Sequence, residues 1–110
     1  MTAENPLKVS AKSNPNAVAG ALAAALRERD RAELQAVGAG AINQAIKAVA
    51  IARNYLKSGG IDAICLPSFV TVAIGEIERT GMSLLVERRA VPELRSDEVL
   101  LAGALGETLG

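Results

Sequence analysis

Apolar and polar positions alternate strictly near the start of the chain, over residues 7–12. This period of two predicts a strand with one buried face and one wet face. Further strand patterns cover residues 32–37, the apolar run 61–66 with its continuation 69–74, and residues 79–89. Pro67 separates the two parts of the third strand and predicts a bulge or bend there. Residues 75–78 are predicted to form the hairpin tip before the last strand.

Two helices are predicted between these strands. The first begins after Asn14, which is a favourable N-cap, with Pro15 at the first helical position, and it runs to about residue 29. Its predicted inward residues are Val18, Leu22, Ala25 and Leu26. The second helix follows the turn Gly38-Ala39-Gly40 and runs to about residue 57, where Ser58-Gly59-Gly60 ends it.

The second helix is apolar on two sides. The stripe expected to face the sheet consists of Ile42, Ala45, Ile46, Val49, Ala52 and Leu56. The opposite apolar side consists of Ala48, Ile51 and Tyr55. A polar seam between them consists of Asn43, Gln44, Lys47 and Asn54. Because a helix that is apolar on both sides is buried on both sides, we expect a second copy of the chain to cover the second side.

The order strand-helix-strand-helix-strand-strand predicts an α/β fold. Right-handed crossovers place both helices on one face of a mixed four-stranded sheet, which makes a compact two-layer β-α-β-α-β-β sandwich over residues 7–89. The other sheet face is expected to be exposed and carries Lys8, Ser10, Lys12, Glu33 and Gln35. Residues 1–6 are predicted to be a flexible lead-in. Residues 90–110 are predicted to be a tail that holds a short helix around residues 96–105.

The amino-acid composition argues against several classes of function. Half of the 110 residues are apolar but only Tyr55 and Phe69 are aromatic, so we expect a small aliphatic core that is helped by oligomerisation. The formal net charge is zero, so binding to nucleic acid would need a local basic patch. The chain has no His and a single Cys, which argues against a zinc site, a His-based active site and an internal disulfide. We expect no catalysis, no cofactor, no membrane insertion and a cytoplasmic location.

Two long motifs resemble the stage V sporulation protein S family. They are residues 7–16 with the following Val18-Ala19-Gly20, and residues 35–53. The resemblance continues through Glu78-Arg79-Thr80 to about Arg88 and covers nearly all of residues 7–89. That family is similar to the Alba-like fold, whose members bind DNA or RNA as dimers. The resemblance therefore implies a regulatory protein of bacterial sporulation or cell division on a dimeric nucleic-acid-binding scaffold.

The candidate nucleic-acid contacts are Lys8, Lys12, Ser13, Asn14, Asn43, Gln44 and Lys47. Lys12, Ser13 and Asn14 precede a helix N-terminus, where a lysine and backbone N–H groups can bind phosphate. The alternative is an ordinary N-cap beside a solvated lysine. The amides and the lysine of the polar seam can contact phosphate, sugar or base edges. The alternatives there are a solvated helix edge or hydrogen bonds across a dimer. Arg53 falls inside the core-facing arc and is expected to snorkel or to pair with a carboxylate.

Other features favour simpler interpretations. Glu76 and Glu78 oppose one Arg79 at the hairpin, whereas Alba proteins that bind nucleic acid typically have a basic arm there, so we do not expect this hairpin to grip a groove. The Gly-x-Gly turn lacks the third glycine of a dinucleotide site, because Asn43 stands there, and is interpreted as a tight strand-to-helix turn. Cys65 is interpreted as a small buried hydrophobe.

Three functions remain open from the sequence. The first is an Alba-like dimer that binds nucleic acid. The second is an oligomeric adaptor that recruits protein partners, partly through the tail. The third is a sensor of a small anionic ligand that uses the Ser13-Asn14 and Gly38-Ala39-Gly40 turns.

Overall fold

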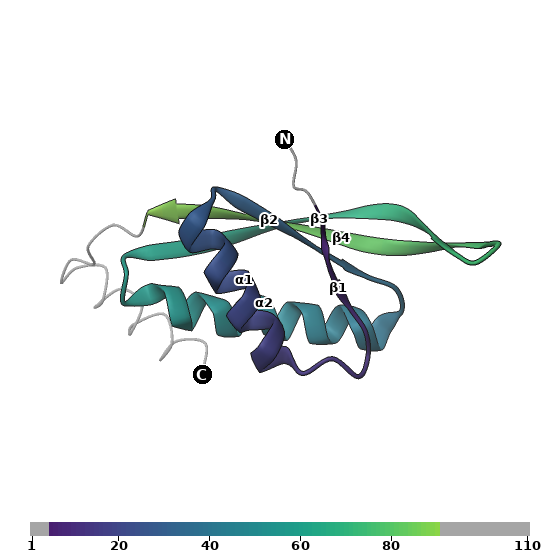
Figure 1. The fold of residues 1–110 in the computed structure, drawn as a ribbon, viewed down its shortest axis with the longest axis horizontal. Coiled ribbons are helices and arrows are strands. Elements are labelled where there is room, and N and C mark those ends of the chain that lie inside the picture. Colours follow the sequence, from purple (N-terminus) through teal and green to yellow (C-terminus); the bar gives the residue numbers. More distant parts are fainter. Residues whose placement is uncertain (1–4, 91–110) are drawn as a thin grey trace, which may run out of the picture.

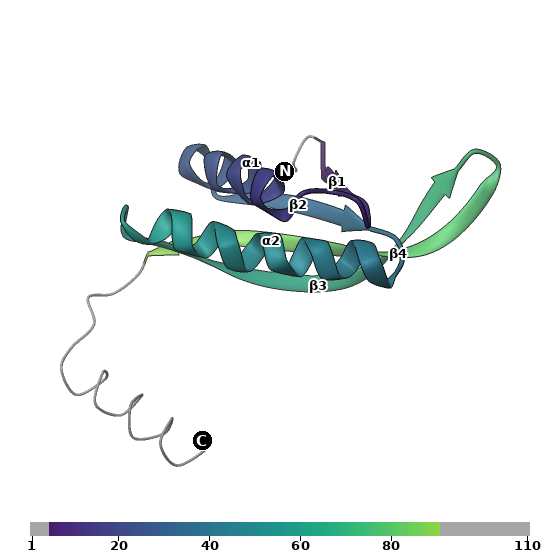
Figure 2. The same cartoon turned by 90° about the horizontal axis from the view of Figure 1, so that it is seen from below.

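The computed structural model describes residues 5–90 of the chain. The elements are β1 (Leu7–Val9), α1 (Pro15–Glu28), β2 (Arg31–Ala36), α2 (Ala39–Lys57), β3 (Ile61–Ile74) and β4 (Ile77–Ala90). The strands form one sheet in the order β1-β2-β4-β3, in which β1 and β2 are parallel and the other pairs antiparallel. Both helices cover one face of this sheet (Figures 1 and 2). The predicted α/β fold is confirmed, whereas the predicted tail helix lies outside the described residues.

The start of α1 follows the local chemistry of its sequence. The Asn14 side chain accepts a hydrogen bond from the Asn16 backbone N–H at 2.8 Å, and Pro15 occupies the first helical position, where no N–H is needed. At the other end of α1, the Arg29 N–H donates to the Ala25 carbonyl. The predicted N-terminus of this helix is confirmed to the residue.

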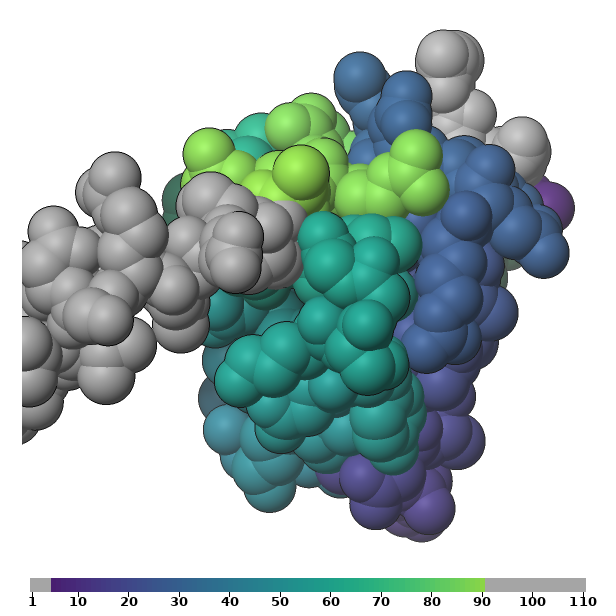
Figure 3. Space-filling view, turned by 90° about the vertical axis from the view of Figure 1, so that its left-hand side faces the viewer, coloured from purple at the N-terminus to yellow at the C-terminus, as the bar shows by residue number. Residues whose placement is uncertain are grey.

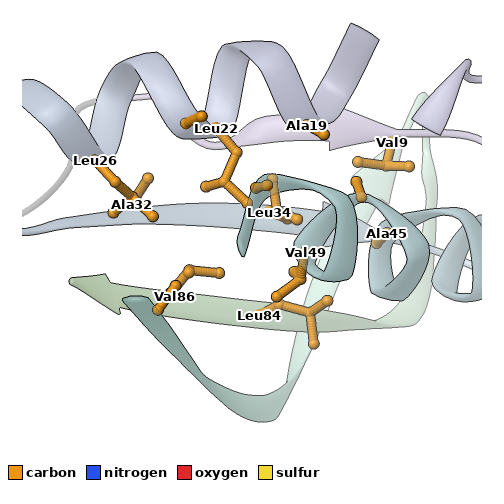
Figure 4. Packing of buried hydrophobic residues seen from close by; sticks show 14 of the residues in the cluster. Val9, Ala19, Leu22, Leu26, Ala32, Leu34, Ala45, Val49, Leu84 and Val86 are labelled. Atoms are coloured by element: carbon orange, nitrogen blue, oxygen red, sulfur yellow. The ribbon is translucent and has the colours of Figure 1, made fainter. Parts of the chain in front are cut away.

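The core lies between the sheet and the two helices and is small and aliphatic, as predicted (Figure 4). Its largest fully buried side chains are Leu22, Leu26, Leu34, Leu56, Leu84 and Val86. Alanines complete it where the helices approach the sheet and each other, namely Ala19, Ala23, Ala41, Ala45, Ala48 and Ala52. Such small side chains allow the backbones of α1 and α2 to come close together.

The burial of α2 differs from the prediction in one respect. Ile46, which was predicted to face the sheet, is 49% exposed, and Ala48, on the side assigned to a second copy, is fully buried within the single chain. The reason is that α1 packs along α2 and covers the side that carries Ala48. The buried arc therefore lies between the sheet and α1, and the prediction that another copy covers Ala48 is wrong.

Of the bulge or bend predicted at Pro67, the bulge is wrong. β3 and β4 pair in an unbroken antiparallel register from Ile61 opposite Ala90 to Ile74 opposite Ile77, with Pro67 opposite Leu84. β3 is the outermost strand of the sheet, and an edge strand tolerates a residue without a backbone N–H.

Part of the β3–β4 hairpin extends beyond the rest of the sheet. β2 pairs only with residues 82–87 of β4, so residues 70–74 and 77–81 pair only with each other. We call this two-stranded segment the arm; it projects beyond the end of α2 and is curved (Figures 1 and 2). Its turn is Gly75-Glu76, shorter than the predicted tip, and the φ of +64° at Gly75 suits the first position of a two-residue hairpin turn.

Candidate nucleic-acid interface

The loop between β1 and α1 is held by its two serines. The Ser10 N–H donates to Ser13 Oγ at 2.9 Å, the Ser13 N–H donates to the Ser10 carbonyl at 3.0 Å, and the Lys12 N–H donates to Ser10 Oγ at 3.2 Å. These bonds fix the loop and leave the Lys12 side chain exposed. Ser13 is thus a structural residue of the loop, and Lys12 is the residue that the loop presents to solvent.

Two further candidates also have structural roles. Asn14 caps α1, as described above, which is the ordinary N-cap considered as the alternative. Gln44 is half-buried, and its Nε2 donates to the Ser13 carbonyl at 2.8 Å. This bond ties the loop to α2 and fixes Lys12 beside the N-terminal half of that helix.

The Gly-x-Gly turn brings the same two segments together. Gly38 adopts a φ of +95°, a backbone conformation that favours glycine. A Cβ on Gly40 would lie 3.0 Å from the Cβ of Ala11, so glycine at this position permits close approach of the loop to α2. Each glycine has a local structural reason, which supports the interpretation of this motif as a tight turn.

Asn43 and Lys47 lie on the solvent-exposed face of α2. Lys12 is also exposed, on a loop that the Gln44 bond holds at the N-terminal half of α2. α2 contains three cationic residues and no acidic residue. A phosphate that approaches this helix therefore meets no carboxylate from the helix itself.

Lys8 is not brought together with these residues. It alternates with the buried Val9 and pairs with Gln35 across the strands, so its side chain points to the sheet face opposite the helices. There it lines a hollow of about 340 Å³ beneath the arm, with Val9, Ser10, Ala11, Gln35, Val37, Val72, Ala73 and Ile74.

A second cationic region lies at the C-terminal end of α2. Arg53, Asn54 and Lys57 line a hollow of about 380 Å³ together with Ala50, Ile61 and Asp62. Asn54 was assigned to the polar seam but not to the binding site, and Lys57 was missed. The spacing 43, 47, 50, 54 and 57, which follows one exposed helix face, was the available signal.

Arg53 pairs with a carboxylate, as expected. Its Nε and Nη2 donate to the two oxygens of Asp62 at 2.7 and 3.0 Å. This bidentate bond lowers the pKa of Asp62 below its ordinary value of 3.8, helped by the Ala63 N–H and by the charge of Arg89, while partial burial acts in the opposite direction. Asp62 is consequently ionised at neutral pH and balances one of the nearby cations.

Arg88 serves the end of α1 rather than a binding surface. Its guanidinium donates to the carbonyls of Leu26 and Arg27 at 3.1 and 3.3 Å and to Asp30 at 3.2 Å. It thus satisfies carbonyl groups that the last turn of the helix leaves unpaired.

Charge is distributed unevenly along the chain. Residues 5–90 contain eleven basic and seven acidic residues, a net charge of +4, although the whole chain is neutral. Two of the seven acids, Glu76 and Glu78, are exposed on and beside the turn of the arm. The cationic character therefore belongs to the body of the molecule, and the arm is unsuited to phosphate.

Other chemistry finds little support within residues 5–90. They contain no group of three or more His, Cys, Asp or Glu side chains that could hold a metal ion. Burial raises the pKa of the Cys65 thiol, so its reactive thiolate form is disfavoured. In the same part of the chain, no helix is both long and apolar enough to cross a membrane.

Comparison with protein families identifies the chain. The model of the family described as Stage V sporulation protein S (SpoVS) matches residues 5–89. This match covers all but the last residue of the described fold, including the loop 10–14 and the whole of α2. The chain therefore belongs to the stage V sporulation protein S family and is a sporulation-related protein.

Proposed function

We propose that this family member is a dimeric, non-catalytic module that binds nucleic acid and acts in the regulation of sporulation or cell division. The observation that carries the proposal is the exposed face of α2, which combines Asn43, Lys47, Asn54 and Lys57 with no acidic residue. From Asn43 to Lys57 this face extends about 20 Å, at about 1.5 Å per residue. It is long enough to contact several phosphates of one strand.

The loop 10–14 extends this face at the N-terminal end of α2. Lys12 is exposed there, and the bond from Gln44 to the Ser13 carbonyl fixes the loop on the helix. A cation on a fixed loop loses less conformational entropy on binding than a cation on a mobile one. This arrangement supports contact of Lys12 and Lys47 with the same nucleic acid.

The exposed apolar side chains in and next to the arm support the proposed dimer. A ribbon of two strands is marginally stable by itself in water, and this one exposes Ile74 by 51% and Ile77 by 66%. Phe69, just before the arm, is 80% exposed. A second copy that covers these side chains, rather than Ala48, is the dimer partner we propose, in keeping with the dimers of the Alba-like proteins that this family resembles.

The test is a salt series of binding to a short labelled duplex DNA and to a single-stranded RNA. We expect Lys12→Glu/Lys47→Glu to lower the affinity by roughly tenfold or more at low salt and to reduce the salt slope by about two. Lys8→Glu is the control, because it reverses one charge on the opposite sheet face. If it loses half or more of the binding free energy that the double variant loses, binding is a general charge effect and the proposed face is wrong.

The adaptor remains the second candidate, favoured by the apolar, acidic arm. It predicts no binding of either nucleic acid at the lowest salt, together with a defined oligomer. Detection of that oligomer with no change on addition of DNA or RNA would replace the first proposal.

A further inference from the structure

We propose that residues 91–110 bind in cis to the cationic hollow at the C-terminal end of α2, and that the bound tail competes with nucleic acid there. The competition rests on the proposed function, whereas the binding of the tail does not. The surface is the hollow of about 380 Å³ described above, and the occupant is the segment that follows Ala90.

Residues 91–110 and residues 5–90 carry opposite net charges. Residues 91–110 contain the acidic residues Glu93, Asp97, Glu98 and Glu107 but only one basic residue, Arg95. Their net charge is −3, against +4 for residues 5–90, and Glu4 supplies the remaining −1. The neutrality of the whole chain thus conceals two oppositely charged segments, which attract each other at low ionic strength.

The hollow has a surplus of positive charge. Arg53 and Lys57 line it against one carboxylate, that of Asp62, so the lining carries a net charge of +1. Asp62 is already bonded to Arg53, and Lys57 forms no ion pair with another residue of the range 5–90. One further carboxylate would neutralise this region.

The last strand, β4, ends beside the hollow. β4 ends at Ala90, which pairs with Ile61, a residue of the hollow wall. The end of β4 and the adjoining ends of α2 and β3 meet on one side of the molecule, where Figure 3 shows the yellow-green and teal surfaces in contact. The tail therefore starts at the hollow and needs no linker to reach it.

The reach of the tail matches the target. At about 3.3–3.6 Å per extended residue, the carboxylates at positions 93–98 can lie up to about 10–28 Å from Ala90. Lys57 and Lys47 are separated by about 15 Å along α2. The tail can thus occupy the end of the helix near Lys57 and extend toward Lys47.

Apolar groups are also matched. Ala50 and Ile61 contribute apolar surface to the hollow, and the tail intersperses its acids with Leu94, Val99, Leu100, Leu101 and Leu105. A segment with both features gains from hydrophobic contact as well as from charge, and part of its binding would persist at moderate salt.

The direct test is carbodiimide cross-linking of the full chain, which joins a carboxylate to a lysine amine without a spacer, followed by mass spectrometry. We expect Lys57 to couple to residues 93–98 in preference to Lys8 and Lys12. Lys57→Arg keeps the charge and should abolish this product, whereas Lys12→Arg should leave it unchanged. An equal mixture of ¹⁴N- and ¹⁵N-labelled chains identifies coupling between copies, and mixed-isotope products that approach half of the total would overturn binding in cis.

The functional test compares two charge-neutralised variants of the full chain. Glu93→Gln/Glu98→Gln should raise the affinity for duplex DNA by about fivefold at low salt. Glu76→Gln/Glu78→Gln, which removes the same charge at the arm, should raise it less, and equal effects would overturn the competition.

The two tests separate the two proposals. The Lys57 cross-link without any binding of DNA or RNA would retain the docked tail and reject the nucleic-acid function. Binding of DNA that is unchanged by tail neutralisation, with no Lys57 cross-link, would do the reverse.

Discussion

β3 and β4 run through both the arm and the rest of the described chain, which we call the body, yet their apolar residues differ sharply in exposure between the two. In the body, Leu84 and Val86 of β4 are at most 1% exposed, whereas Ile77 of the same strand is 66% exposed in the arm. Ile77, Leu84 and Val86 are all aliphatic, so residue type does not explain their different exposure. The difference is that β2 pairs with the strand from residue 82 onward and its end packs on Gly81, whereas residues 77–80 of the strand are exposed.

This comparison shows that the arm has the sequence of a covered strand without a cover. Val70, Val72 and Ile74 alternate along β3 as they would on a buried face. Val70 and Val72 are partly buried, whereas Ile74 and Ile77 are exposed, and exposed apolar side chains that cluster on a small protein commonly mark an interaction surface. The predictions below test whether the body and the arm differ in stability, in packing and in anchoring.

The largest effect is expected from truncating equivalent apolar residues in the two regions. Leu84→Ala removes a fully buried side chain and should lower the free energy of unfolding by about 2–5 kcal/mol. Ile77→Ala should lower the unfolding free energy of the monomer by less than about 1 kcal/mol but should weaken self-association. Urea unfolding at low protein concentration measures the first quantity, and sedimentation equilibrium measures the second.

These two measurements test whether the arm is an interface or part of the core of the single chain. If Ile77→Ala weakens self-association and leaves monomer stability nearly unchanged, the arm is an interface. If it destabilises the monomer as much as Leu84→Ala does, the arm belongs to the core of the single chain and the comparison fails.

An intermediate effect is expected at the junction of the two regions. A Cβ on Gly81 would lie 2.9 Å from both the Ala36 carbonyl oxygen and Val37 Cγ2, because the end of β2 packs directly on this glycine. We expect Gly81→Ala to lower the free energy of unfolding by about 1–3 kcal/mol. Thermal unfolding of the variant measures this, through the shift of Tm.

Gly20→Ala is the matched control within the body. Gly20 lies in the middle of α1, and a Cβ there would meet no heavy atom within 4 Å. The substitution should therefore stabilise the protein by about 0.5–1 kcal/mol through its helix propensity. A stabilising Gly81→Ala would mean that β2 does not press on the arm junction.

The local parts of the fold could be predicted from the sequence. The cap Asn14-Pro15 depends on neighbouring residues alone, so the helix start was predicted correctly. The strand predicted over residues 7–12 ends at Val9, because Ser10 and Ser13 hydrogen-bond each other and close a loop there. The cover of Ala48 depends on the path of α1, which periodicity does not contain. The tolerance of Pro67 depends on β3 being an edge strand, which is likewise a property of the whole sheet.

The candidate site, too, could be predicted only in part from the sequence. Residue type suggested seven contacts, but Ser13, Asn14 and Gln44 use their polar groups to hold the loop and its helix. A polar side chain in a sequence does not reveal whether a backbone group will engage it. Lys57 could have been found, because the absence of acids from residues 39–57 is visible in the sequence.

The smallest effect is expected at the base of the hairpin, where β3 is anchored on α2 by the Arg53–Asp62 pair. Asp62→Asn should lower the free energy of unfolding at pH 7 by about 0.2–1 kcal/mol, because the Arg53 side chain is 55% exposed and solvent screens the pair. The side-chain oxygen that remains in Asn can still accept the Ala63 N–H, so the variant removes the charge and one of the two hydrogen bonds from Arg53 and retains this contact.

The pH dependence of this effect gives the sharper test. The folded pKa of Asp62 is lowered, so the stability from the pair is fully present above the unfolded value near 3.8 and is lost as pH falls through the lower folded pKa. The difference in unfolding free energy between the native chain and Asp62→Asn, measured by urea unfolding from pH 7 to pH 2, should therefore shrink below pH 3.8. Asp30→Asn is the control, because Asp30 is 85% exposed and bonds Arg88 by a single longer contact of 3.2 Å. A difference that stays constant to pH 2 would show that Asp62 acts through packing rather than through its charge. In that case the base of the hairpin, like the arm, would not be held by an ion pair.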